Sequence, residues 1–217
     1  MNYYVSIIFN LFIIIPAIIG LVRFKKINTA YYPFVLLIVV GSLTEIISII
    51  LAFTIRNNMY SYNIYVLVEI LLIIWQLKNW HAFRLKATPF ILGGFMILLW
   101  MIEIFFISHI ATKAPYFRLT AAFAVVLISV NMLNTLIVRE RKNILTNSQF
   151  LICLGFTIYF TLKILVQSFS FYGLLSNIVF ARKVDVIHTI FNAFTNIIYG
   201  FAILWMPTKQ RFSMPSS

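Results

Sequence analysis

Residues 33–55 have the sequence PFVLLIVVGSLTEIISIILAFTI, an apolar run that contains one ionisable side chain, Glu45. A helix that crosses a bilayer needs about 20 consecutive, mostly apolar residues, and this run reaches that length. Each apolar residue returns about 0.3–0.6 kcal/mol on insertion, which together offsets the about 2.5–3.5 kcal/mol cost of one charge. The run therefore predicts a transmembrane helix with a carboxyl group near the middle of the bilayer.

Six further apolar runs have the same character, and the third of the seven is the shortest. The predicted helices span residues 3–22, 33–55, 62–77, 89–110, 119–138, 148–170 and 184–206. With 62% hydrophobic and only 10% charged residues, the chain lacks the polar surface of a soluble domain. The gaps between the runs are too short for a separate domain. The sequence thus predicts an all-α polytopic membrane protein, in which residues 1–217 form a single bundle of seven transmembrane helices.

The basic residues predict the orientation of this bundle in the membrane. The gaps on one side hold most of them: Arg23, Lys25, Lys26, Lys78, Arg84, Lys86, Arg139, Arg141, Lys142, Lys209 and Arg211. The gaps on the other side hold fewer: Arg56, Lys113, Arg118, Arg182 and Lys183. Because cytoplasmic loops are enriched in Lys and Arg, we expect a multi-pass protein of the cell membrane with its N-terminus outside and its C-terminus cytoplasmic. Lipid headgroups account for the net charge of +12, so no nucleic acid partner is expected.

Polar side chains recur every three or four residues in several of the runs, which places them on one side of each predicted helix. Ionisable residues at membrane depth normally face the interior of a bundle, where they bind ligands or ions or pair with one another. The candidate ligand- or ion-binding residues are Glu45, Tyr65, Glu69, Glu103, Lys163, Gln167, Asp185, His188 and Asn192. Under the predicted orientation they lie between the midplane and the outer surface, with Glu45 deepest and Asp185 near a helix end. We therefore expect a polar, charged cavity in the outer half of the bundle.

Charge balance within this layer is incomplete. One glutamate can pair with Lys163, and burial is expected to leave the other carboxyl groups protonated. The prediction requires Glu45 and Lys163 to face the same interior space. A purely structural interpretation, in which the charges only fix the packing of the helices, stays open at this point.

Motifs that indicate enzymes are absent from the sequence. It contains no HExxH zinc helix, no GxSxG nucleophile elbow and no glycine-rich phosphate loop. No histidine pair has metal-ligand spacing, and the single Cys153 excludes an intramolecular disulfide. We therefore expect no catalytic residues, no metal site and no cofactor.

Three functions remain compatible with the sequence. The first is a receptor-like sensor that binds a small ligand or a proton and acts on a membrane or cytoplasmic signalling partner through its basic loops. The second is a small secondary transporter or channel that uses the same carboxylates. The third is a noncatalytic assembly subunit in the lipid bilayer. The sensor is favoured because the inner half is mostly apolar, although Gln76, Asn131 and Asn134 could extend a polar route inward.

Overall fold

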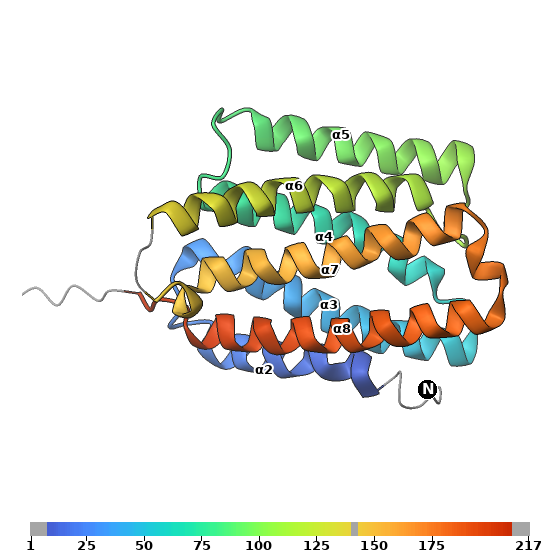
Figure 1. Cartoon of the computed structure of the whole chain (residues 1–217), viewed down its shortest axis with the longest axis horizontal. Coiled ribbons are helices and arrows are strands. Elements are labelled where there is room, and N and C mark those ends of the chain that lie inside the picture. The colour runs from blue at the N-terminus through green and yellow to red at the C-terminus, as the bar shows by residue number, and fades with distance from the viewer. Residues whose placement is uncertain (1–7, 140–142, 210–217) are drawn as a thin grey trace, which may run out of the picture.

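The computed structural model of the chain describes residues 8–139 and 143–209. Over these residues the fold is a bundle of helices without a β-strand (Figure 1). Six helices are long and apolar enough to cross a membrane, and a shorter apolar helix, Ile8–Arg23, precedes them. The predicted all-α, multi-span architecture of seven helices is confirmed.

The helices run up and down the bundle and are joined by short turns. Their bounds are α2 (Ile14–Arg23), α3 (Tyr32–Thr54), α4 (Met59–Asn79), α5 (Thr88–Ile102), α6 (Pro115–Arg139), α7 (Ser148–Phe171) and α8 (Ile178–Leu204). Short 3-10 turns cover Leu11–Ile13, Thr29–Tyr31, Ile144–Thr146 and Leu174–Ser176, and a π-helical turn, Glu103–Ile107, extends α5. The predicted start of the first helix at Tyr3 lies outside the described residues.

Several helices begin earlier than their apolar runs, and the difference is largest for α8, which begins at Ile178. The side chain of Asn177 accepts hydrogen bonds from the N–H groups of Val179 and Phe180, at 3.0 and 3.2 Å, and so caps α8. As a result Arg182 lies within α8, whereas the apolar run predicted a start at 184. Asp185 consequently lies about 10 Å from the start of α8, at about 1.5 Å per residue, instead of near its end. The predicted start lies too far along the chain, because an apolar run ends at charged residues even where the helix continues through them.

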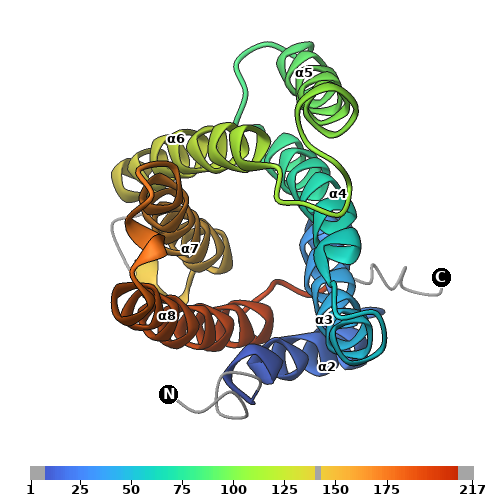
Figure 2. The ribbon, with the colours of Figure 1, turned by 90° about the vertical axis from the view of Figure 1, so that its right-hand side faces the viewer.

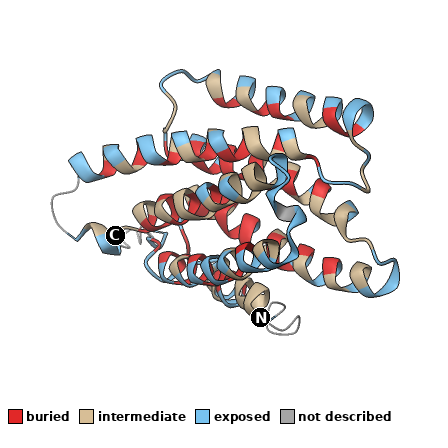
Figure 3. Ribbon diagram, turned by 45° about the vertical axis from the view of Figure 1, so that its right-hand side comes forward, coloured by how far each residue is buried: buried red, intermediate tan, exposed pale blue. Residues whose placement is uncertain are grey.

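Six of the helices form a ring, and α5 lies outside it (Figure 2). Around the ring α2 is followed by α3, α4, α6, α7 and α8, which returns to α2. Buried residues face the inside of the bundle, while α5 is mostly exposed (Figure 3). Its exposed side chains are large and apolar, with Ile91 70% exposed, so this helix has the surface expected for contact with lipid.

A cluster of aromatic side chains from α3, α7 and α8 packs inside the ring of helices. Phe34 and Tyr199 pack edge to face with their centroids 5.2 Å apart, and Phe156 lies 6.0 Å from each of them. Phe160 joins the group at 6.3 Å from Phe156. A Cβ atom at Gly155 would lie 2.3 Å from Cε1 of Tyr199, so this position requires glycine. We call Phe34, Phe156, Phe160 and Tyr199 the aromatic floor.

The chain segment after α8 is fixed to the loop between α2 and α3. The N–H of Asn28 donates to the carbonyl of Pro207 at 3.0 Å, and the N–H of Lys209 donates to the carbonyl of Lys26 at 2.8 Å. The guanidinium of Arg23, at the end of α2, donates to carbonyl groups at the end of α8. We call residues 206–209 the C-terminal strap.

Candidate functional site

A cavity of about 360 Å³ lies inside the ring, on one side of the aromatic floor. Its walls come from α3, α4, α6, α7 and α8, with Asn10 before α2 and Lys113 in the loop before α6. Eight of the nine candidate residues line it: Glu45, Tyr65, Glu69, Lys163, Gln167, Asp185, His188 and Asn192. The residues of one polar layer, predicted from helical spacing, therefore surround one space.

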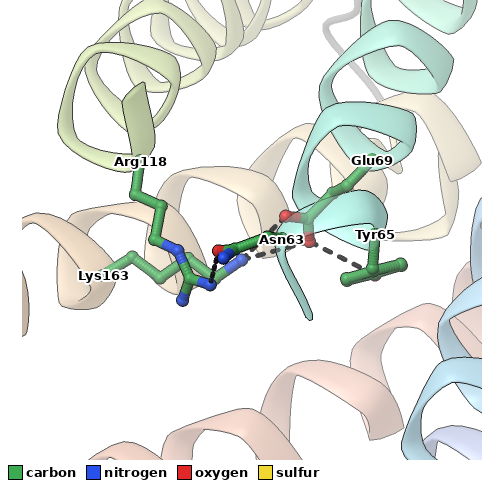
Figure 4. Close-up of polar contacts among 5 residues, drawn as sticks. All are labelled: Asn63, Tyr65, Glu69, Arg118 and Lys163. Carbon is green, nitrogen blue, oxygen red and sulfur yellow. Dashed lines mark hydrogen bonds and ion pairs between the residues drawn. The ribbon is translucent and has the colours of Figure 1, made fainter. Parts of the chain in front are cut away.

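An ion pair between α4 and α7 crosses this cavity. Nζ of Lys163 lies 2.8 Å from Oε2 and 3.2 Å from Oε1 of Glu69 (Figure 4). The Glu69 side chain is only 4% exposed and that of Lys163 is 24% exposed, so the pair is shielded on the α4 side and open to the cavity on the α7 side. Glu69 lies about 15 Å from Met59, at about 1.5 Å per residue, which is half of a hydrocarbon core of about 30 Å. A charge at this depth needs a partner, and Lys163 supplies it.

Aromatic groups complete the surroundings of the pair. The hydroxyl of Tyr65 donates to Oε1 of Glu69 at 3.3 Å. Nζ of Lys163 lies over the rings of Tyr159 and Phe160, 4.4 and 4.9 Å from their centroids, where cation–π attraction stabilises an ammonium group. The pair thus has more contacts than a single ion pair would give.

Glu45 lies on α3, at another wall of the cavity. Its carboxylate accepts a hydrogen bond from the hydroxyl of Tyr62 at 3.1 Å. Among the described residues, Glu69 and Lys163 form the only ion pair with an N–O distance of 4.0 Å or less. Glu45 therefore has no described cation within that distance. Glu45 therefore keeps a carboxyl group available to a molecule in the cavity.

Arg118, on the first turn of α6, also lines the cavity, and the sequence did not identify it as a site residue. Its Nη2 donates to Oδ1 of Asn63 at 2.8 Å. Nδ2 of Asn63, which is 1% exposed, donates to the carbonyls of Ile110 and Thr112 at 2.8 and 2.6 Å. Asn63 therefore holds both the loop before α6 and the guanidinium. Figure 4 shows the cationic ends of Arg118 and Lys163 close together, facing α4.

Arg118 was assigned to a loop because it precedes the apolar run of the fifth predicted helix. A signal for the correct assignment was present in Pro115, since proline is favoured in the first turn of a helix. A start at Pro115 puts Arg118 on the same side as Ala121, Ala122 and Val125, all of them buried in the bundle.

Glu103 lies apart from the cavity, and the expectation that it belongs to the polar layer is wrong. It starts the π-helical turn after α5 and is 0% exposed. Its carboxylate accepts a 2.9 Å hydrogen bond from the N–H of Tyr116 and a second bond from the N–H of Phe117. These N–H groups belong to the first turn of α6, where no intrahelical acceptor exists and the helix dipole favours a negative charge. Glu103 is thus a helix cap supplied by a neighbouring helix.

Replacing Glu103 with alanine is expected to lower the free energy of unfolding by about 1–2 kcal/mol, because two N–H groups of α6 lose their acceptor. Thermal unfolding of the purified protein in lipid nanodiscs measures this loss. Phe106→Ala, at a side chain that is 85% exposed, is the control and should leave the melting temperature nearly unchanged. Equal melting temperatures for the Glu103 variant and the control would contradict the capping role.

The polar residues of α8 complete the cavity wall. Nδ2 of Asn192 donates to Oδ1 of Asn10 at 3.3 Å and so connects α8 to the segment before α2. The ring of His188 lies beside that of Tyr159, with centroids 6.3 Å apart. Asp185 is exposed. Within the described ranges no three His, Cys, Asp or Glu side chains are grouped so that they could hold a metal ion.

The cavity therefore presents carboxylates, cationic groups and tyrosine hydroxyls to one enclosed space, and it can bind a polar molecule of either charge. Comparisons of the chain with protein-family models, with curated proteins and with solved structures found no match.

Proposed function

We propose that the chain is a receptor-like sensor of the cell membrane that binds a small molecule or a proton in the cavity. The single observation that carries this proposal is the cavity itself, about 360 Å³ in volume and lined by ionisable residues from five helices. Small-molecule sites in proteins are usually cavities of about 300–1,000 Å³ with a few convergent polar groups. The proposal assigns no catalytic role to the chain.

The aromatic floor supports sensing over transport. Phe34 and Phe156 are at most 1% exposed, and Tyr199 is 6% exposed, so the floor is tightly packed. In the proposed sensor, a solute that enters the cavity is stopped at this floor. Binding without passage is what a sensor requires.

In the proposed orientation the cavity is reached from outside, and the strap and the basic loops lie in the cytoplasm. Lys25, Lys26, Arg84 and Lys86 are exposed at that end of the bundle. They supply a positively charged surface for a membrane or cytoplasmic signalling partner. A change in the position of α8 at the cavity would reach this surface through the strap.

One observation favours transport as the second candidate. A smaller cavity of about 30 Å³ shares Tyr65, Glu69 and Asn192 with the main cavity and extends to Asn196 and Tyr199. The smaller cavity is also lined by Phe156 and Phe160, so it reaches into the aromatic floor, and widening it there would open a polar path past the floor. A noncatalytic assembly subunit is the third candidate, and the capping role of Glu103 shows that one of the buried charges is structural.

Binding and flux measurements separate the three candidates. The purified protein in nanodiscs is screened by thermal shift against amino acids, organic acids, amines, sugars and a range of pH values. Each stabilising compound is then tested for uptake into proteoliposomes, with an internal pH dye to follow protons. We expect stabilisation that is lost in Glu45→Gln, kept in the control Lys78→Met, and accompanied by no flux.

Two outcomes overturn this proposal. Uptake of a stabilising compound, lost in Glu69→Gln, would establish a transporter. The absence of any stabilising compound and of any pH effect, with Glu45→Gln indistinguishable from wild type, would leave the assembly subunit.

A further inference from the structure

We propose that the ligand of the cavity is a small zwitterion, a molecule with one carboxylate and one ammonium group. This inference rests on the proposed function, because it names the chemical class of the molecule that the sensor binds. It follows from the way in which the charges of the cavity wall are paired and left unpaired.

The wall carries acidic and basic side chains in equal number. Its acidic residues are Glu45, Glu69 and Asp185, and its basic residues are Lys113, Arg118 and Lys163. A ligand with a net charge would disturb this balance in a site surrounded by lipid, where an uncompensated charge is costly. A neutral ligand with two opposite charges preserves it.

Only one acid and one base of this set form an ion pair with each other among the described residues, Glu69 and Lys163. Lys113 and Asp185 are exposed, so water can compensate their charges. Glu45 and Arg118 are only partly exposed and lie in the wall of the cavity. They are the acid and the base that a bound molecule can pair with.

The guanidinium of Arg118 is prepared to bind an anion. Asn63 accepts from Nη2 at 2.8 Å and fixes the side chain, while the buried Nε has no hydrogen-bond partner among the described residues. Arg118 lines the cavity, and a carboxylate there can accept from the terminal nitrogens of its guanidinium.

Glu45 provides the complementary end. It lies on α3 and Arg118 on α6, on either side of α4 in the ring. Between them α4 presents Tyr62, Tyr65 and Val66 to the cavity, a surface suited to the carbon chain of a ligand. The hydroxyl of Tyr62 already donates to Glu45 at 3.1 Å, which orients the carboxylate. A single ligand with its ammonium group at Glu45 and its carboxylate at Arg118 would give both side chains an ion-pair partner.

A homologous series of ω-amino acids, from glycine to aminooctanoic acid, tests this inference because it varies the separation between the two charges. Binding to the wild-type protein in nanodiscs is measured by isothermal titration calorimetry and thermal shift. The matched probes are the alkanoate and the alkylamine of the same chain length. We expect at least one amino acid to bind ten-fold or more tightly than both of its matched probes.

The variants assign each end of the ligand. Arg118→Gln should reduce the affinity for the amino acid to that for the alkylamine, and Glu45→Gln should reduce it to that for the alkanoate. Arg182→Gln, at an exposed arginine of α8 outside the cavity, is the matched control and should bind like wild type. If Arg118→Gln does not fold, Arg118→Lys keeps the charge without the planar fork and should bind with intermediate affinity.

Equal affinity for an amino acid and its alkanoate, or no binding of any amino acid in the series, overturns the inference. The proposed function survives either result if the screen finds a stabilising compound of another class, such as an organic acid or an amine. Flux of the bound amino acid would overturn the sensor but leave the ligand class intact.

Discussion

Replacing Lys163 with methionine is expected to lower the free energy of unfolding by about 3 kcal/mol, because Glu69 would be left as a buried carboxylate without its cation. Removing one partner of a buried ion pair costs about 3–5 kcal/mol, and the 24% exposure of the Lys163 side chain to the cavity places this change at the lower end. Equilibrium unfolding in mixed detergent micelles measures the loss. Lys78→Met, at an exposed lysine that stacks on Phe90, is the matched control and should cost less than about 1 kcal/mol.

A double-mutant cycle isolates the pair from its surroundings. Glu69→Gln alone leaves Lys163 without its acceptor, whereas Glu69→Gln combined with Lys163→Met removes both charges. The double variant should be at least about 1 kcal/mol more stable than the sum of the two single losses predicts, since contacting residues are coupled. Additive losses would mean that the two side chains do not interact in the membrane.

The second large effect is expected at Phe156, whose replacement with alanine should cost about 3–5 kcal/mol. The side chain is 1% exposed and packs against Phe34, Phe160 and Tyr199, with centroid distances of 6.0, 6.3 and 6.0 Å. Alanine would leave a void in the aromatic floor that its rigid rings fill only in part. The same unfolding measurement detects the loss, and Phe105→Ala, at a 71% exposed ring, is the control.

The single cysteine provides a second measurement on the same variant. Cys153 is 0% exposed and lies about one turn from Phe156 on α7. A membrane-impermeant thiol reagent should therefore label Cys153 slowly in the wild-type protein and several-fold faster in Phe156→Ala. Unchanged labelling together with unchanged stability would mean that Phe156 does not seal the floor.

The number and approximate position of the helices could be predicted from the sequence, because a spanning segment must be long and apolar whatever it packs against. The ends were less certain. The Asn177 cap extends α8 through Arg182 and Lys183, which have low hydropathy but are acceptable in a helix close to its end. Capping residues, more than hydropathy, decide where these helices begin.

The candidate site could be predicted in part. Glu69 and Lys163 were identified because a lone charge in an apolar run has few stable places, and the bundle interior is one of them. Glu103 satisfies the same condition but faces the start of α6, since depth alone does not tell which side of a helix a residue occupies. The segment that carries Glu103 is apolar nearly all round, so its rotation is set by packing and could not be predicted from the sequence. Arg118 was missed for a different reason, the late predicted start of its helix.

The C-terminal strap has a mechanical consequence. It ties the loop after α2 to the end of α8, and a second contact joins Asn10, before α2, to Asn192, near the middle of α8. The two helices are thus held to each other at two places along α8. In the proposed sensor, a displacement of α8 at the cavity would move the end of α8 and the loop after α2 together, and would in this way reach the surface around Lys26.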